Sequence, residues 1–148
     1  EYMVMHTNNK TNTWGLPSLL PIYYGESVRS AFTKKAGTGK FKAEWVANLP
    51  EAGKYEIFIY RPQFRDNNYP GMKNYYTVYT PEKKEEVVLE IEKGDPVWVS
   101  LGNFTLPAGE SRVVLDDRGV SIEEKSYGGV IKHDQLIVAD AVKWVKIK

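Results

Sequence analysis

The side chains that carry most acid–base and metal chemistry in proteins are scarce in this chain. It has no cysteine, so disulfides and thiolate zinc sites are absent, and its only histidines are His6 and His133. A zinc site would therefore depend on scattered carboxylates. The Gly-x-Ser-x-Gly turn that presents a hydrolase nucleophile is also missing. The sequence thus predicts no catalytic group of these kinds.

Two further patterns have a plain structural interpretation. Adjacent acids occur at 85–86, 116–117 and 123–124. Neighbouring strand residues point to opposite faces, so these acids cannot work as acid–base pairs, and we interpret them as solvated charge. The segment Gly37–Lys40 resembles the end of a phosphate-binding loop, but Lys34 stands where a glycine is needed and Phe41 replaces the Ser or Thr. We expect a turn there.

Two residues interrupt strand-like runs near the C-terminus. Gly102 lies within the aromatic and β-branched run 98–104 and predicts a bulge or a close backbone approach. Asp140 lies within the apolar run 136–144, where a carboxylate needs hydrogen-bond partners. It is either a perturbed carboxylate in a site or a buried acceptor that ties loop backbone to the last strand. We favour the second role, since no histidine or second acid lies near it in the sequence.

The polar stretch from Arg61 to Asn74 is the best candidate for ligand binding. It is too long for a hairpin turn, and Phe64 can anchor it. Sugar recognition needs flat aromatic surface together with planar donors and acceptors, and this loop with its flanking strands offers both. An ordinary structural loop is the alternative. The candidate ligand-binding residues are Tyr60, Arg61, Arg65, Asp66, Asn67, Asn68, Tyr69, Tyr75 and Tyr79.

The elements that must position these residues are strands. Period-2 runs are common and turn residues punctuate them at short intervals, which is typical of a sandwich or barrel. The run 54–61 is apolar or aromatic on both faces, so we expect it to be central. Residues 117–135 are mixed, with Gly128-Gly129 as a loop tip, and residues 1–26 form a lead-in or linker to a domain at 27–148. The predicted strands are 28–35, 40–48, 54–61, 74–80, 85–92, 97–106, 110–116 and 136–147.

Composition sets broader limits. A chain of 148 residues with 42% hydrophobic residues is expected to form one domain with one core. The net charge of +1 gives no indication of the clustered positive charge that binds nucleic acid or an anionic membrane. No apolar run approaches the about 20 residues that cross a bilayer. The aromatic share of 13% fits a β-rich fold and also fits an exposed recognition surface.

The order of these segments resembles the golvesin C-terminal-like family, also described as the xanthan lyase carbohydrate-binding-like domain. The resemblance covers about 27–145. Its matched positions look like core and turn residues, among them Trp45, Trp98 and Val142 for packing and Gly53 and Gly109 for backbone conformation. The segments that carry it are Ala43–Trp45, Leu49–Tyr55, Tyr76–Val78, Trp98–Phe104, Ala108–Gly109, Val113–Leu115 and Val138–Val142.

The resemblance implies an all-β, jelly-roll β-sandwich similar to galactose-binding domains. Members typically lie at the C-terminal end of secreted bacterial enzymes, including polysaccharide lyases, and are not the catalyst. It therefore implies a secreted, periplasmic or cell-surface location. The partners implied are a polysaccharide or oligosaccharide and a neighbouring catalytic domain. No cofactor is implied, and a structural calcium ion stays open because no loop shows a ligand spacing for it.

Three functions follow from these observations. The first is a non-catalytic accessory module that binds carbohydrate. The second is a structural module that docks on a neighbouring domain or self-associates, with Tyr60, Tyr75 and Tyr79 buried in that contact. The third is a free-standing lyase or hydrolase, which would need a Tyr, His or Lys base beside an arginine. No such clustering is visible in the sequence, so the first is our expectation and the second its alternative.

Overall fold

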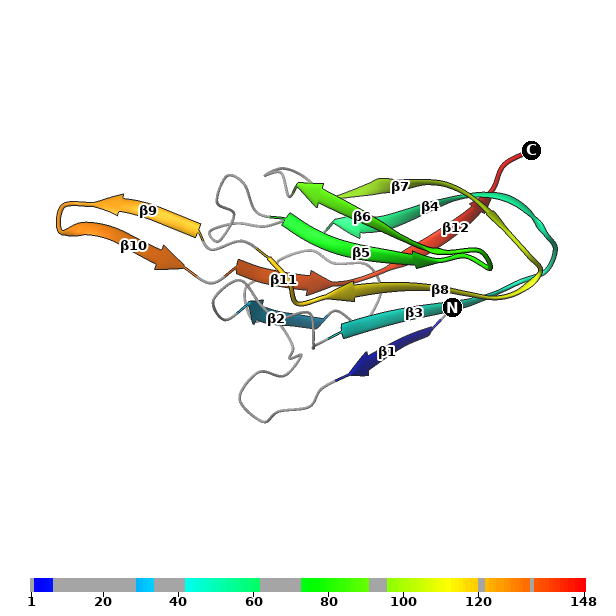
Figure 1. Ribbon diagram of the computed structural model, residues 1–148, viewed down its shortest axis with the longest axis horizontal. Helices are drawn as coiled ribbons and strands as arrows, with labels where there is room; N and C mark the ends of the chain where they lie inside the picture. Colours follow the sequence, from blue (N-terminus) through cyan, green and yellow to red (C-terminus); the bar gives the residue numbers. More distant parts are fainter. Residues whose placement is uncertain are drawn as a thin grey trace.

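All regular structure in the computed structural model is β-strand (Figure 1). It describes residues 2–6, 29–33, 42–61, 73–90, 96–119, 122–133 and 135–148, and these hold twelve strands. The strands are β1 (Tyr2–His6), β2 (Arg29–Thr33), β3 (Lys42–Leu49), β4 (Gly53–Arg61), β5 (Lys73–Tyr79), β6 (Lys84–Glu90), β7 (Val97–Leu106), β8 (Gly109–Asp116), β9 (Ile122–Ser126), β10 (Gly129–His133), β11 (Gln135–Ala139) and β12 (Val142–Lys146).

Two antiparallel sheets form the body of the fold. The larger has the strand order β1-β3-β8-β5-β6 and the smaller the order β12-β4-β7. The chain changes sheet between β3 and β4, between β4 and β5, and on either side of β7. A two-stranded ladder joins β11 to β2, and β9 with β10 forms a hairpin that extends away from both sheets (Figure 1). The all-β expectation is thereby confirmed.

The core lies between the two sheets and follows from period-2 alternation. On β4, Tyr55, Ile57 and Ile59 are buried while their neighbours are partly exposed. On β5, Tyr76 and Val78 are buried in the same way. Each sheet therefore buries one apolar face against the other. The core cluster comprises Ala43, Trp45, Leu49, Tyr55, Ile57, Ile59, Tyr76, Val78, Leu101, Phe104, Leu106, Val113, Leu115, Ile137, Ala139 and Val142.

Most predicted strands are found with bounds within two residues, and β4 is central in its sheet as expected. Two segments differ. The stretch 117–135 contains the β9–β10 hairpin, whose tip is at Tyr127 and Gly128. In the N-terminal stretch, β1 pairs with β3 as a strand of the larger sheet. Neither segment shows a sustained period-2 pattern, so their pairing follows from tertiary context.

The last predicted strand is interrupted at Asp140, so the expectation that Asp140 lies inside a strand is wrong. β11 pairs with β2 in a separate two-stranded ladder, whereas β12 pairs with β4 in the smaller sheet. Between them, the Asp140 carbonyl oxygen accepts a hydrogen bond of 3.1 Å from Trp45 Nε1. The Ala141 carbonyl accepts one of 2.8 Å from the Tyr60 backbone N–H. The strand breaks here because its backbone acceptors turn to these two donors.

A bulge interrupts the pairing of β7 with β4, as Gly102 predicts. Ile57 is opposite Gly102 while Phe58 is opposite Ser100, so Leu101 is the extra residue. Gly102 has a φ of 119°, a conformation that glycine adopts without steric cost. The Gly102 backbone N–H donates to Ser100 Oγ at 3.1 Å, and that hydroxyl donates to Glu56 Oε1 at 2.8 Å. The bulge is thus fixed by backbone conformation and by a hydrogen-bonded side chain.

Asp140 is one of several buried side chains with polar groups inside the sandwich. Asp140, Asn74 and Tyr76 are each at most 6% exposed. Burial raises the pKa of the Tyr76 phenol above its ordinary value of 10.0, the hydrogen bond with Asn74 opposes this rise, and the charge of Asp140 adds to it. The phenol is therefore held in its neutral form inside the sandwich.

We predict that Gly102→Ala destabilises the fold by about 1–3 kcal/mol, because alanine is strained at this φ. Crowding is not the cause, since an added Cβ would lie 3.7 Å from the Phe104 ring, an ordinary contact. Urea denaturation measures the change. Gly128→Ala, with open space around it, is the matched control, and we expect it to change stability by less than about 0.5 kcal/mol. Equal midpoints for the two variants would contradict the role of the bulge.

We also predict an alkaline loss of stability that depends on Tyr76. Unfolded Tyr76 releases its proton near pH 10 while the folded phenol keeps it, so stability is unaffected below pH 10 and falls as the pH rises beyond it. One tyrosine contributes a slope of at most about 1.4 kcal/mol per pH unit. Urea midpoints between pH 8 and 11 should fall less steeply for Tyr76→Phe. Tyr127→Phe, at a fully exposed tyrosine, should keep the parent slope, and an unchanged slope in Tyr76→Phe would refute the assignment.

Candidate functional site

The structure divides the predicted binding residues between two surfaces. Tyr60 and Arg61 end β4 in the smaller sheet, while Tyr75 and Tyr79 lie on β5 in the larger one. Tyr60 alternates with the buried residues of β4, and the two β5 tyrosines alternate with those of β5. All three rings therefore point away from the core, but from opposite sheets. Arg65, Asp66, Asn67, Asn68 and Tyr69 lie outside the described residues.

On the larger sheet, arginines cover the exposed tyrosines. The Arg118 guanidinium lies 4.6 Å from the centroid of the Tyr75 ring. It also binds Asp116 and Glu86, and these carboxylates hold the pKa of Arg118 above its usual range. Neither Tyr75 nor Tyr79 offers a fully open ring face on this sheet.

The contacts of Tyr79 follow the same pattern. The Arg112 guanidinium lies 4.0 Å from its ring centroid and forms an ion pair of 3.3 Å with Glu44. Lys84 approaches the same ring at 5.3 Å. The outer face of the larger sheet thus carries rings covered by two arginines that are themselves paired with carboxylates.

The smaller sheet carries a different surface, which we call the aromatic platform and define as Phe58, Tyr60 and Trp98. The register places Trp98 opposite Tyr60. The two rings meet edge to face, with centroids 5.1 Å apart and an interplanar angle of 67°. All three side chains are partly exposed. The sheet backbone therefore presents adjoining aromatic rings to solvent on two neighbouring strands.

Trp98 is the residue that sequence reasoning misplaced. The expectation of a packing role holds for Trp45 and Val142, which are 2% and 1% exposed. Trp98 instead faces outward, because the extra residue Leu101 reverses the alternation of β7. Phe104 points inward on the C-terminal side of the bulge, yet Trp98, an even number of residues before it, points outward. The signal was present in Gly102 itself.

Lys143 of β12 lies over the platform. It is opposite Phe58 in the register, and its Nζ reaches to 4.3 Å from the Trp98 ring centroid and 5.2 Å from that of Phe58. No carboxylate in the described part of the chain forms an ion pair with it. Nearby Lys146, by contrast, is paired with Glu51 at 2.6 Å. An exposed cation–π contact contributes about 0.5–1 kcal/mol, so Lys143 is held only loosely.

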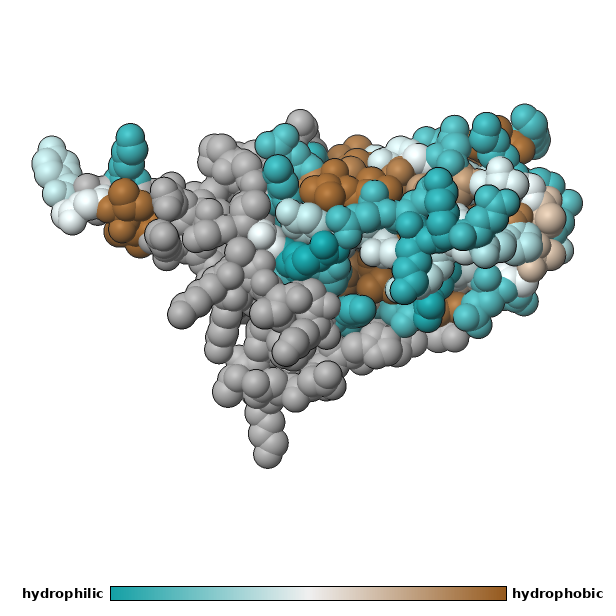
Figure 2. Space-filling model, in the orientation of Figure 1, coloured by the Kyte–Doolittle hydropathy of each residue, from teal (hydrophilic) through white to brown (hydrophobic). Residues whose placement is uncertain are grey.

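A hollow of about 460 Å³ opens beside Trp98, between β7 and β6. Figure 2 shows hydrophobic side chains gathered where these two strands lie in Figure 1. Val88 and Val97 are 44% and 43% exposed there. Arg61 lines this hollow with Trp98, but it follows Tyr60 on β4 and so extends from the opposite face of the strand, and Tyr60 is not part of the lining. The lining residues are Ile59, Arg61, Leu89, Glu90, Val97, Trp98, Val99 and Ser100.

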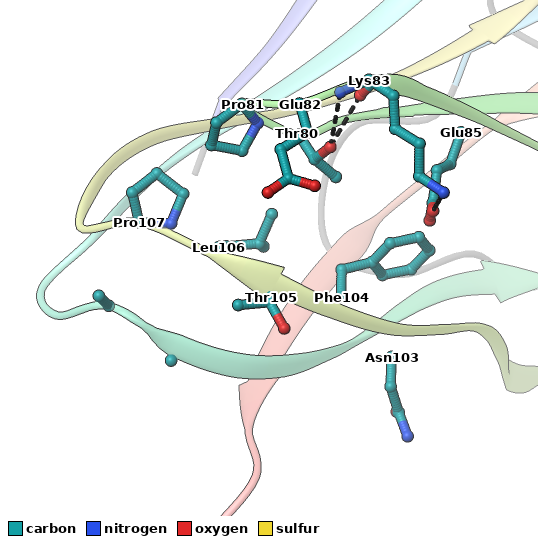
Figure 3. A pocket seen from close by; sticks show the side chains of 12 residues that line it. Thr80, Pro81, Glu82, Lys83, Glu85, Asn103, Phe104, Thr105, Leu106 and Pro107 are labelled. Atoms are coloured by element: carbon teal, nitrogen blue, oxygen red, sulfur yellow. Dashed lines mark hydrogen bonds and ion pairs between the residues drawn. The ribbon is translucent and has the colours of Figure 1, made fainter.

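A second hollow, of about 490 Å³, lies at the other end of β7 (Figure 3). The Thr80 hydroxyl donates to the Lys83 carbonyl at 2.8 Å and shapes the turn above it. Lys83 is neutralised by Glu85, which raises the lysine's pKa. The Phe104 ring on the β7 side is 5% exposed and belongs to the core. This hollow therefore lacks an open aromatic surface.

The described residues contain no cluster of metal-ligating side chains. No three His, Cys, Asp or Glu side chains among them are placed to hold a metal ion. Among the same residues, no helix is long and apolar enough to span a bilayer. The larger sheet has an outer face on which arginines pair with carboxylates, and the smaller sheet has an outer face with partly exposed aromatic rings.

These features define an all-β sandwich built from two antiparallel sheets. The chain belongs to the Golvesin C-terminal domain family, which it matches over residues 3–146. A solved structure of Paenibacillus xanthan lyase is similar in fold, with a TM-score of 0.65 at 18% identity. The match covers 99% of this chain and 13% of that one, so the chain spans a small part of its length. No curated protein matches the sequence.

Proposed function

We propose that this chain is a non-catalytic accessory module that binds carbohydrate for a polysaccharide-degrading enzyme. The aromatic platform of Phe58, Tyr60 and Trp98 is the observation that carries the proposal. Sugars present flat C–H faces to aromatic rings and hydroxyls to planar polar groups. Arg61, which lines the hollow at the sheet edge beside Trp98, would supply such a group at the border of the platform and not on its face. The predicted loop residues Arg65, Asp66, Asn67, Asn68 and Tyr69 follow directly in the chain and complete the proposed site.

Tyr75 and Tyr79 fall outside this proposed site. Their rings face away from the opposite sheet and are contacted by Arg118 and Arg112. A sugar would have to displace guanidinium groups that carboxylates also hold. Stacking there is therefore less favourable than on the smaller sheet.

The parent protein in this proposal is a larger polysaccharide lyase or hydrolase of bacterial origin that acts outside the cytoplasm. Two findings support it: membership of the Golvesin C-terminal domain family and the likeness to a xanthan lyase chain of which this module would span 13%. The catalytic groups would then lie in a neighbouring domain. The module's contribution would be to hold polymer near that domain and raise its effective concentration.

We propose further that the sandwich is a jelly roll of the galactose-binding type. The support is its connectivity. The chain passes from one antiparallel sheet to the other between β3 and β4, between β4 and β5, and on either side of β7. Among the described strands β3 to β8, β5 and β6 are the only two that are consecutive in the chain and also pair with each other. Such crossing between two layers is typical of jelly rolls.

A docking module is the second candidate function. The apolar surface around Val88 and Val97 favours it, because exposed apolar patches mark contacts with protein as well as with ligands. In that case mutation of this patch would detach the module from its neighbouring domain without any effect on glycan retention.

We predict that Trp98→Ala weakens polysaccharide binding by about tenfold, since it removes the largest ring of the platform. Affinity gel electrophoresis against immobilised xanthan, polygalacturonate, galactan and hydroxyethyl cellulose measures retention of the whole chain. Tyr79→Ala removes a ring of the opposite face and should leave retention unchanged, with circular dichroism verifying the fold of both variants. Failure of the parent chain to be retained on any of these polymers would refute carbohydrate binding.

A further inference from the structure

We propose that the aromatic platform selects sugars that carry a carboxylate, and that Lys143 is the residue that makes this selection. The inference rests on the proposed function and concerns its ligand class. It starts from a single contrast between the two outer faces of the sandwich. The arginines on the larger sheet have carboxylate partners, whereas Lys143 on the smaller sheet contacts rings and, among the described residues, forms no ion pair.

The position of Lys143 follows from the sheet. β12 lies next to β4, and the register sets Lys143 beside Phe58. From there the side chain extends across β4 to Trp98 on β7, so that its Nζ lies 4.3 Å from the indole centroid. The lysine therefore covers the ring surface that a sugar would use. A ligand that stacks on Trp98 must move this ammonium group aside or bind it.

The consequence differs between neutral and acidic sugars. A neutral sugar displaces the ammonium group from the rings and offers only hydroxyls in return. An acidic sugar offers a carboxylate, which forms a stronger, charge-assisted hydrogen bond with the same group. An acidic sugar thus compensates for the lost cation–π contact of Lys143, whereas a neutral sugar does not. Lys143 thus acts against neutral ligands and in favour of acidic ones.

The neighbouring charges set the direction of this preference. The hollow on the other side of Trp98 is lined by both Arg61 and Glu90, whose charges oppose each other. Glu56, also on β4, is engaged by the Ser100 hydroxyl at 2.8 Å. Lys143 is therefore the cation that lies directly over the ring of Trp98. An acidic sugar is expected to bind with its carboxylate toward β12.

The test compares polymers that differ only in charge. Polygalacturonate is paired with its methyl ester, and carboxymethyl cellulose with hydroxyethyl cellulose, and affinity of the whole chain is measured by isothermal titration calorimetry. We expect the parent chain to prefer the acidic member of at least one pair, with weaker binding as salt rises. Lys143→Gln should lose about tenfold for that acidic polymer and should bind the neutral partner as tightly as the parent chain or more tightly.

Lys84→Gln is the matched control, because Lys84 also lies over a ring, that of Tyr79, but on the opposite face. It should leave every affinity unchanged. An equal loss in both variants would show general charge attraction and overturn the role of Lys143. A chain that binds neutral and acidic polymers equally, with Lys143→Gln unaltered, would overturn the inference while the proposed function stands. Absence of binding to all four polymers would instead refute the proposed function, and the inference would fall with it.

Discussion

The candidate site depends on the bulge at Leu101 and Gly102. A strand without it would keep one alternation along its length, and Trp98 would point to the same face as Phe104, into the core. The positive φ of Gly102 and the extra residue Leu101 reverse that alternation. The bulge lets one strand build the core at one end and the aromatic platform at the other. Bulges recur next to functional sites for this reason.

This reversal also marks the limit of what the sequence could predict. The inward faces of β4, β5 and β6 follow directly from period 2, and the residues that alternation places inside are buried or partly buried there. The sequence identifies Gly102 as the position of a bulge. The outward direction of Trp98 follows only when the alternation before the bulge is compared with the alternation after it. Pairing of β1 with β3, or of β11 with β2, leaves no trace in local pattern because partners distant in sequence define it.

For Asp140, the residue type predicts a need for hydrogen bonds but does not predict where the residue lies in the fold. Its type requires that it be hydrogen-bonded if buried, and it is 6% exposed. The sequence could not show that the strand itself ends there, because the donors to the Asp140 and Ala141 carbonyls, Trp45 and Tyr60, lie on two other strands. Beyond this break β12 lies in the smaller sheet, where Lys143 meets the platform. The change of sheet after Asp140 thereby sets where an exposed cation lies.

The two outer faces show why an aromatic and basic composition does not by itself define a binding surface. Both carry tyrosines and cations, and both have cation–π contacts. On the larger sheet the cations of Arg112 and Arg118 are also paired with carboxylates, so a ligand gains little by replacing them. On the smaller sheet the ammonium group of Lys143 contacts rings and has no carboxylate partner within the described ranges, so it can gain a stronger partner. Recognition therefore depends on which charges the fold leaves unmatched, and that is decided by the register of distant strands.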